Sequence, residues 1–220
     1  MSLKNKKILI TAGPTWVALD KVRVLSNMST GENGILMAEE LCREGARVTL
    51  LLGPIKFEMK NPKIRLLRFT FFDQLKDIVL RELRTGHYDW LIHSAAISDY
   101  QPDKFIPRKV GSDRRTWTIK LVPTPKIIDL ARKADKKAFL VGFKFEPDVT
   151  NKALLKDAHN FMVRSGSNLV VANSYKGNVY EGKGYKAFIT DGREVAGPFK
   201  SKKLLAKELV ALMKKFYGKN

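Results

Sequence analysis

The stretch from Leu91 to Pro102 has the residue types expected where a strand ends at a binding site. The apolar run Trp90-Leu91-Ile92 gives way to small residues, and the chain then turns polar at Asp99. This pattern is typical of a buried parallel strand at its carboxyl end, where open α/β sheets bind ligands. Ala95 and Ala96 would let a flat ligand lie against the backbone, and Asp99 could accept hydrogen bonds from an amino group. The alternative is a plain strand-to-loop exit with a solvated aspartate.

A second candidate site follows the first predicted strand, Lys7–Thr11. The loop that starts at Gly13 lacks both the Gly-x-Gly-x-x-Gly fingerprint and the P-loop pattern. Ser29 or Thr30 is expected to cap the next helix, so that backbone N–H groups from Gly31 to Gly34 point at an anion. An ordinary capped helix is the alternative at this position.

Two polar side chains in the same loop extend this candidate site. Arg23 could make a charge-assisted contact to phosphate or carboxylate, and Asn27 offers both a donor and an acceptor. A phosphate-binding turn, the strand exit at Asp99 and the basic loop around Lys109 could therefore face one crevice.

Apolar strands alternate with helical segments along most of the chain. Strands are expected over residues 7–11, 47–52, 64–68, 89–94, 138–143 and 169–172, with helices after Gly31, near 72–85, between the last two strands, and over 200–215. Such alternation predicts an α/β fold with a mostly parallel central sheet and helices on both faces. A further strand is predicted over 116–121, and residues 185–190 with 194–195 predict a C-terminal hairpin. We expect one domain over residues 1–220.

The net charge of +19, from 41 Lys and Arg against 22 Asp and Glu, allows three interpretations. They are nucleic-acid binding, a strongly anionic small substrate, and a solvated basic surface. The basic residues recur in several stretches rather than in one stripe, and most aromatic residues lie in apolar runs. A nucleic-acid-binding module is therefore disfavoured, and anionic ligands are favoured.

Cysteine and histidine are too scarce for several common kinds of site. The single Cys42 cannot form an internal disulfide, which fits the reducing cytoplasm. Three scattered histidines offer little for a metal cluster, and His93, at the end of an apolar strand, is expected to be packed rather than catalytic. The sequence contains no run of eighteen or more apolar residues, so no membrane span is predicted.

Six segments together carry a specific resemblance. They are Ile-Thr-Ala-Gly-Pro-Thr at 10–15, Val-Arg-Val-Leu-Ser-Asn-Met-Ser-Thr-Gly at 22–31, Ala-Ala-Ile-Ser-Asp-Tyr-Gln-Pro at 95–102, Leu-Val-Pro-Thr-Pro-Lys-Ile-Ile at 121–128, Val-Gly-Phe at 141–143 and Leu-Val-Val-Ala-Asn at 169–173. In content and order they resemble the phosphopantothenate–cysteine ligase family, whose fold is a Rossmann-like three-layer sandwich. The resemblance covers roughly residues 7 to 173.

The resemblance implies a two-step ligase of coenzyme A biosynthesis. CTP or ATP, with Mg²⁺, would activate the carboxylate of 4′-phosphopantothenate as an acyl-nucleotide, and the amine of L-cysteine would then form the amide. Bringing a carboxylate to a polyanion needs positive charge, and no Ser-His-Asp or cysteine nucleophile is required. The resemblance also implies a homodimer, with the hairpin over 185–195 as a candidate interface. A flavin-dependent decarboxylase, fused or separate, is an expected partner, although the chain resembles the monofunctional form or a ligase domain expressed alone.

The family's motifs also imply roles for particular residues. Asn27 would hold the acyl-nucleotide, Arg23 would support the same pocket, and Lys109 would contact the triphosphate from a mobile loop. Asp99 would read the amino group of the base. The other residues that the resemblance assigns to the nucleotide are Gly13, Ser29, Gly31, Ala95, Ala96, Pro125, Lys126, Ile127, Ile128, Phe143, Asn160 and Arg164.

This chain departs from the family pattern near the phosphate contacts. Asn160 and Arg164 stand where the family often has two lysines, and the loop usually written Lys-Ile-Lys-Lys is here Arg108-Lys109-Val110-Gly111-Ser112. A relative that binds nucleotide without ligase turnover is therefore an alternative. A second alternative is an NAD(P)-dependent reductase, but the glycine fingerprint and the Tyr-x-x-x-Lys pattern are both missing.

Overall fold

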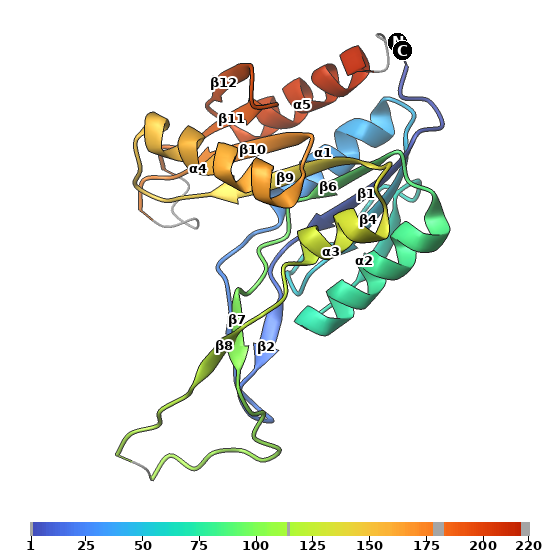
Figure 1. The fold of residues 1–220 in the computed structure, drawn as a ribbon. Coiled ribbons are helices and arrows are strands. Elements are labelled where there is room, and N and C mark those ends of the chain that lie inside the picture. Colours follow the sequence, from blue (N-terminus) through green and yellow to red (C-terminus); the bar gives the residue numbers. More distant parts are fainter. Residues whose placement is uncertain (1, 114, 178–182, 217–220) are drawn as a thin grey trace.

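A computed structural model describes residues 2–113, 115–177 and 183–216 of the protein. Its centre is a sheet formed by β1 (Lys7–Ala12), β4 (Arg47–Leu52), β5 (Arg65–Arg68), β6 (Trp90–His93), β9 (Phe139–Phe145), β10 (Leu169–Ser174), β11 (Lys186–Thr190) and β12 (Val195–Phe199). The eight strands lie in the order β12-β11-β10-β9-β6-β1-β4-β5 (Figure 1). Those from β5 to β10 are parallel, and the pair β11 and β12 is antiparallel. The predicted sheet with its C-terminal hairpin is confirmed.

Helices cover both faces of this sheet. They are α1 (Glu32–Arg43) and α5 (Lys202–Phe216) on one face, and α2 (Phe72–Gly86), α3 (Ile127–Ala134) and α4 (Asn151–Ser165) on the other (Figure 1). Ile8 and Ile10 of β1 are buried in the cluster formed with α1 and α5, whereas Leu9 is buried in the cluster formed with α2 and α3. Burial on both faces explains why the strand is a continuous apolar run. The Rossmann-like three-layer sandwich is confirmed.

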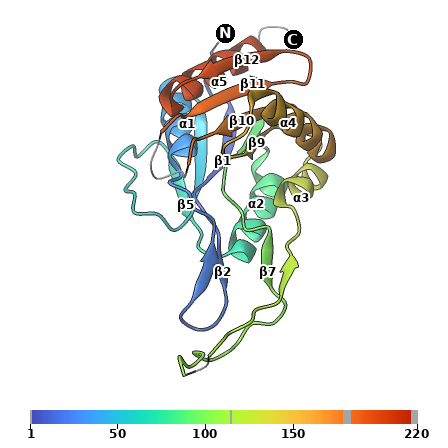
Figure 2. The ribbon, with the colours of Figure 1, turned by 90° about the vertical axis from the view of Figure 1, so that its left-hand side faces the viewer.

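Two short antiparallel hairpins form an arm that projects from the edge of the body (Figures 1 and 2). One pairs β2 (Trp16–Ala18) with β3 (Val24–Ser26), and the other pairs β7 (Tyr100–Pro102) with β8 (Leu121–Pro123). We call residues 16–26 and 100–123 the arm. The two hairpins of the arm follow β1 and β6 along the chain. The arm is therefore attached to the carboxyl ends of two neighbouring central strands.

Asp20 joins the two hairpins of the arm. Its carboxylate is fully buried and accepts hydrogen bonds from the backbone N–H groups of Val22 and Arg23 at 2.8 Å each. It also accepts one from the Val110 N–H at 3.1 Å and forms an ion pair of 2.6 Å with the Arg23 guanidinium. Burial disfavours the charged form, but these N–H donors and the Arg23 charge outweigh it and lower the pKa of Asp20 to about 2.

We expect the contact between the two hairpins to be lost in acid. Because the folded pKa of about 2 lies below the ordinary 3.8, this stabilisation is complete above about pH 4 and disappears as the pH falls through 2. The NMR signal of the Trp117 indole, on which the Arg23 guanidinium stacks at 5.1 Å, reports the change. In Asp20→Asn the loosened signal should already be present at pH 7, whereas Asp103→Asn should behave as wild type. An identical acid response in wild type and Asp20→Asn would refute this role.

The arm is also where the structure departs from the predicted elements. The strand predicted over 116–121 is wrong, because β8 begins at Leu121 and most of the residues before it form the loop at the tip of the arm. The loop predicted after β1 contains a hairpin of β2 and β3 that was not predicted. The second strand of the C-terminal hairpin extends further than predicted, over Val195–Phe199. The other predicted strands and helices agree with the structure to within about two residues at most ends.

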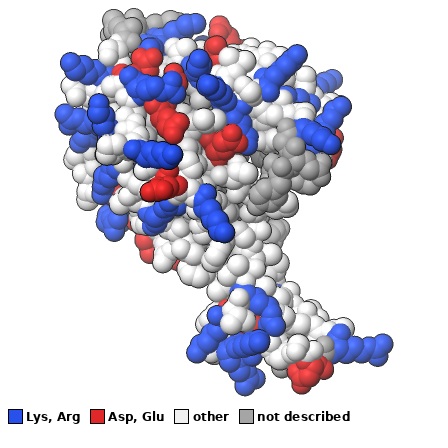
Figure 3. Space-filling model, turned by 180° about the vertical axis from the view of Figure 1, so that it is seen from behind, with Lys and Arg blue, Asp and Glu red and all other residues white. Residues whose placement is uncertain are grey.

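On the face that Figure 3 shows, basic side chains are spread over the body and the arm rather than gathered in one stripe. The tip of the arm carries an exposed group of them, namely Lys104, Arg108, Lys109 and Arg115. Arg114, in the same basic stretch, lies outside the described residues. Among the described residues, no helix has both the length and the apolar character needed to span a bilayer.

Candidate active site

A cavity of about 700 Å³ lies at the carboxyl ends of β1, β6, β9 and β10. The sheet order reverses between β1 and β6, and such switch points are where open α/β sheets bind ligands. Several separate parts of the chain contribute to the wall, among them residues 27–34, 93–97, 124–128, 143–145 and alternate residues of 173–177. The two stretches singled out in the sequence, Asn27–Gly34 and the exit of β6, therefore face one cavity.

The turn before α1 is built on glycine. Gly31 is the N-cap, with a left-handed φ of 68°, so the prediction that Ser29 or Thr30 caps the helix is wrong. Only glycine adopts this φ without strain. The two hydroxyls instead accept the N–H groups of Gly31 and Glu32, at 3.3 and 3.4 Å. Of the four N–H groups expected to face an anion, two therefore already have an acceptor within the turn.

Gly34 lets the first turn of α1 approach the ends of β1 and β6 closely. A Cβ atom at this position would lie 2.5 Å from the Cβ of Ala12 and 2.8 Å from the Oγ of Ser94. Both of these residues belong to central strands or their immediate ends, so they cannot move aside freely. The absence of a side chain at Gly34 therefore fixes how near the helix N-terminus sits to the cavity floor.

We expect Gly34→Ala to lower the free energy of unfolding by about 1–2 kcal/mol, because overpacking outweighs the gain in helix propensity. Chemical denaturation measures the change. Gly111→Ala is the matched control, since a Cβ there would meet only the side chain of Asp113. If Gly34→Ala is as stable as the control or more stable, the close approach does not constrain the helix.

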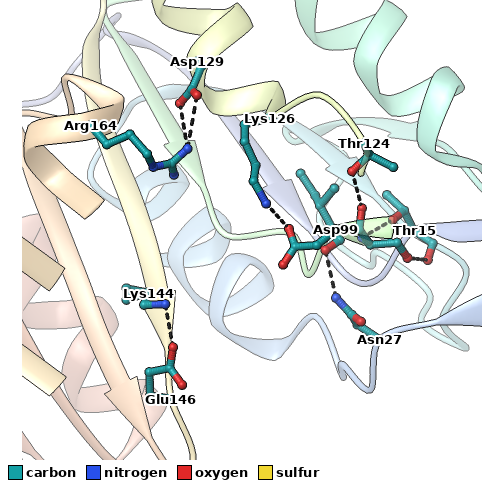
Figure 4. Close-up of polar contacts among 11 residues, drawn as sticks. Thr15, Asn27, Asp99, Thr124, Lys126, Asp129, Lys144, Glu146 and Arg164 are labelled. Carbon is teal, nitrogen blue, oxygen red and sulfur yellow. Dashed lines mark hydrogen bonds and ion pairs between the residues drawn. The ribbon is translucent and has the colours of Figure 1, made fainter. Parts of the chain in front are cut away.

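The exit of β6 is held by a set of short hydrogen bonds (Figure 4). Asn27 donates its side-chain N–H to the carbonyl of Ile97 at 2.8 Å, which fixes the loop before α1 against the strand exit. On the other side, the Ser98 N–H donates to the hydroxyl of Thr15 at 3.0 Å, and the hydroxyl of Thr124 donates to the Ser98 carbonyl at 2.7 Å. The loop after β1 and the segment before α3 are thereby both held against the backbone next to Asp99.

Three cations of the cavity wall are each paired with a carboxylate (Figure 4). Lys126 contacts Asp99 at 2.5 Å, and Lys144 contacts Glu146 at 2.5 Å. The third, Arg164, contacts Asp129 of α3 at 3.1 Å. All three pairs are at least partly exposed, so each is weak and can be exchanged for a ligand anion at little cost.

His93 is the last residue of β6 and lies in the cavity wall although it is only 7% exposed. Its Nδ1 is 3.0 Å from the hydroxyl of Thr11. Burial lowers the pKa of His93 to about 4, so the ring is neutral at pH 7. The prediction that it is packed is correct in part, since it is buried but also faces the cavity.

Most of the predicted site residues come together in this wall. Those that line the cavity are Asn27, Ser29, Gly31, Ala95, Ala96, Asp99, Pro125, Lys126, Ile127, Ile128, Phe143 and Arg164. Gly13 lies just behind it, where its carbonyl accepts the Ala96 N–H at 2.9 Å. Arg23 and Lys109 lie on the arm and Asn160 is exposed on α4, and none of the three is part of the wall.

One side of the cavity contains no residue that was predicted from the sequence. Phe145, Tyr175 and Lys202 all contribute to the wall there. The Lys202 ammonium contacts Glu32 at 2.5 Å and lies 5.7 Å from the centre of the Tyr175 ring. Burial opposes its charge, but Glu32 and Tyr175 outweigh this and raise the pKa of Lys202. The polar end of β10 at Asn173 is the one signal in the sequence that could have indicated this side.

Comparison with known proteins gives one consistent family. The family model of the DNA/pantothenate metabolism flavoprotein C-terminal domain matches residues 3–217. The bifunctional coenzyme A biosynthesis protein CoaBC of Thermococcus kodakarensis is 34% identical over 175 residues, which are 80% of this chain and 43% of that protein. CoaBC of Vibrio parahaemolyticus is 31% identical over 224 residues, 96% of this chain and 53% of that protein. The chain thus spans about half the length of these relatives.

Solved structures agree with this result. The DNA/pantothenate metabolism flavoprotein of Streptococcus pneumoniae superposes with a TM-score of 0.85 at 25% identity, covering 96% of this chain and 99% of that one. The C-terminal domain of a CoaBC protein superposes with a TM-score of 0.80 at 24% identity over the whole of both chains, which shows a common fold. With its fold, its cavity and this match over nearly its full length, the chain belongs to the family of the DNA/pantothenate metabolism flavoprotein C-terminal domain.

Proposed function

We propose that this protein is a phosphopantothenate–cysteine ligase that acts through an acyl-nucleotide. The observation that carries the proposal is the cavity at the switch point, where Asn27, Asp99 and Lys126 from three separate segments meet. The family match over residues 3–217 and the names of the CoaBC relatives support it. The reaction needs a site that binds a nucleotide beside a second anion. The wall of this cavity has apolar side chains that suit a base and cationic side chains that suit anions.

We assign the nucleoside to the part of the cavity that Ile97, Asp99, Pro125 and Ile128 line. Flat apolar surfaces there suit a base, and the Asp99 carboxylate can accept a hydrogen bond from an exocyclic amine, which both cytosine and adenine carry. CTP and ATP are therefore the two candidate co-substrates. The phosphates would lie towards the N-terminus of α1, where the helix dipole favours negative charge.

In this proposal Mg²⁺ binds together with the triphosphate rather than at a metal site formed by the protein. The described part of the chain has no group of three or more His, Cys, Asp or Glu side chains that could hold a metal ion. Mg²⁺ is commonly bound through phosphates with several retained waters, so it can enter with the nucleotide. We assign no step of the reaction to it.

The reaction would proceed in two balanced steps. In the first, the carboxylate of 4′-phosphopantothenate attacks the α-phosphorus, and pyrophosphate leaves. In the second, the amine of cysteine attacks the acyl carbon, loses a proton, and displaces the nucleoside monophosphate. Asn27 would hold the acyl-nucleotide, while Lys126 and Arg164 would exchange their carboxylate partners for ligand oxygens. No covalent enzyme intermediate is needed.

Arg23 and Lys109 can take part in the proposed reaction only if the protein forms a homodimer. Both lie on the arm, outside the cavity wall of their own chain. The arm also exposes apolar side chains, with Val22 61%, Phe105 53% and Tyr100 52% exposed. Such surface is typical of an interface between subunits. The arm is therefore a stronger candidate interface than the C-terminal hairpin, and we propose that the arm of a second copy brings these cations to the site.

Pyrophosphate release tests the proposed function. The protein is mixed with Mg²⁺, 4′-phosphopantothenate and either CTP or ATP, with and without cysteine. Release that requires phosphopantothenate, followed by amide formation when cysteine is added, is the expected result and identifies the nucleotide. Absence of release with both nucleotides, from protein shown to be folded, would leave a binding-only relative as the better account.

A further inference from the structure

His93 lines the cavity but has no role in the reaction proposed above. Parallel pairing places it beside Thr11 of β1 and beside Gly142 of β9. Because side chains alternate along a strand, His93 lies on the same face as Leu91, towards α2 and α3. A Cβ at Gly142 would lie 2.4 Å from the ring of Phe161, which also lines the cavity. The imidazole therefore sits at the floor of the cavity among apolar residues.

The hydrogen bonds of Thr11 determine which ring nitrogen of His93 carries the proton. The Thr11 hydroxyl is fully buried and accepts the N–H of Ala95 at 3.2 Å. Its own proton needs an acceptor, and the Nδ1 of His93, at 3.0 Å, is the one that the described residues provide. With Nδ1 accepting this hydrogen bond, the proton of the neutral imidazole must be on Nε2.

The Nε2 atom of His93 is directed at the cavity. It has no hydrogen-bond partner among the described residues. In the same part of the chain, no fully buried side-chain nitrogen or oxygen is left without a partner. Nε2 must therefore be open to the cavity that His93 lines. The site consequently offers an N–H donor that Thr11 orients and that can bind an acceptor atom of a ligand.

We propose that His93 donates a hydrogen bond from a neutral Nε2–H to an acceptor atom of the nucleoside. This inference rests on the proposed function and adds a specificity determinant to it. The donor lies on the face of the sheet that Ile127 and Ile128 help to cover rather than at the N-terminus of α1, so it faces the base or the ribose rather than the phosphates. A low pKa keeps it a neutral donor at pH 7.

Together with Asp99, this donor defines the kind of base that fits. Asp99 offers an acceptor and His93 offers a donor, so the base must carry both an amine and an acceptor on its edge. Cytosine and adenine both present an amino group next to a ring nitrogen acceptor. Uracil has no amino group to offer Asp99, and it presents an N–H donor where cytosine has the ring nitrogen acceptor.

Nitrogen-15 NMR of the histidine rings tests the inference directly. The chain has only three histidines, so His93→Gln assigns the signals. In the free protein, the ring of His93 should show the proton on Nε2. Addition of the nucleotide that supports pyrophosphate release should shift the Nε2 signal of His93, whereas the signals of His87 and His159 should stay in place. A proton found on Nδ1, or an Nε2 signal that does not respond to bound nucleotide, would overturn the inference.

Calorimetric binding of nucleotide to variants gives an independent measure. His93→Leu, which removes the donor, should bind the nucleotide about tenfold more weakly, since a hydrogen bond of this kind contributes that much. His93→Gln can place an amide N–H near the position of Nε2 and should restore most of the affinity. Exposed His159→Gln is the control and should bind as wild type.

The possible outcomes separate the two proposals. Wild-type affinity in a folded His93→Leu variant would overturn the role of His93 and leave the ligase proposal intact. Failure of the wild-type protein to bind either nucleotide would overturn both. Where His93→Leu does not fold, the NMR signal of the wild-type ring decides alone.

Discussion

Replacement of Asn27 by alanine is expected to lower the rate of amide formation about 100-fold, the usual effect of removing one donor that stabilises a reacting oxygen. Asn27 is exposed at the cavity wall and donates to the Ile97 carbonyl at 2.8 Å, which places its amide beside the strand exit. Its loss should affect kcat more than KM, because the acyl-nucleotide is held only during the reaction. Steady-state rates of amide formation measure the effect.

Asn151→Ala is the matched control for this variant. Asn151 begins α4, is exposed, and does not line the cavity, so its activity should equal that of wild type. Thermal unfolding of both variants shows whether either fold has changed. A folded Asn27→Ala variant with wild-type kcat would show that this amide does not take part in the reaction.

Asp99→Asn is expected to raise the KM for the nucleotide about 10- to 100-fold, since hydrogen bonds to a charged partner contribute about 1.5–3 kcal/mol. The carboxylate is the acceptor proposed for the exocyclic amine of the base, and an amide can turn its N–H groups to the same position. The change also releases Lys126, which lies 2.5 Å from Asp99. Nucleotide titrations of pyrophosphate release measure both KM and kcat.

The preference for a base should change along with the affinity. In the Asp99→Asn variant, UTP should compete with CTP better than it does in wild type, because an amide can donate to a carbonyl oxygen. Asp103→Asn is the control, since Asp103 belongs to the arm and its side chain forms an exposed pair with Lys120 at 3.5 Å. Unchanged KM and unchanged discrimination in Asp99→Asn would contradict the assignment of the base to this part of the cavity.

The body of the fold was predictable because its signals are local. β1 and β4 are six-residue strands that contain short apolar runs and end at glycine-proline turns, and α1 has its apolar residues on one face. The arm was not predictable in this way. β2, β3, β7 and β8 are three residues long, and every residue of β3 is exposed, so no apolar periodicity marks them. These strands form because the ends of β1 and β6 bring them together. A short window of sequence does not contain this information, since the two ends are about 80 residues apart.

The candidate site was predicted to a similar extent, for the same reason. The exit of β6 identified Ala95, Ala96 and Asp99 from residue types alone, and the family resemblance added Phe143 and Arg164. The resemblance also assigned Arg23 to the pocket, but Arg23 is held on the arm by Asp20 and the Val110 carbonyl. Lys202 was not assigned to the site, because its contact with Glu32 joins residues 170 positions apart.

Transfer of ¹⁸O tests the acyl-nucleotide most directly. The substrate is 4′-phosphopantothenate labelled with ¹⁸O in its carboxylate, incubated with the protein, cysteine, Mg²⁺ and the nucleotide that supports turnover. The account predicts that one labelled oxygen appears in the nucleoside monophosphate, because the carboxylate attacks the α-phosphorus and the amine then displaces the nucleotide. Label in inorganic phosphate, or amide formation with no label in any phosphate product, would contradict it.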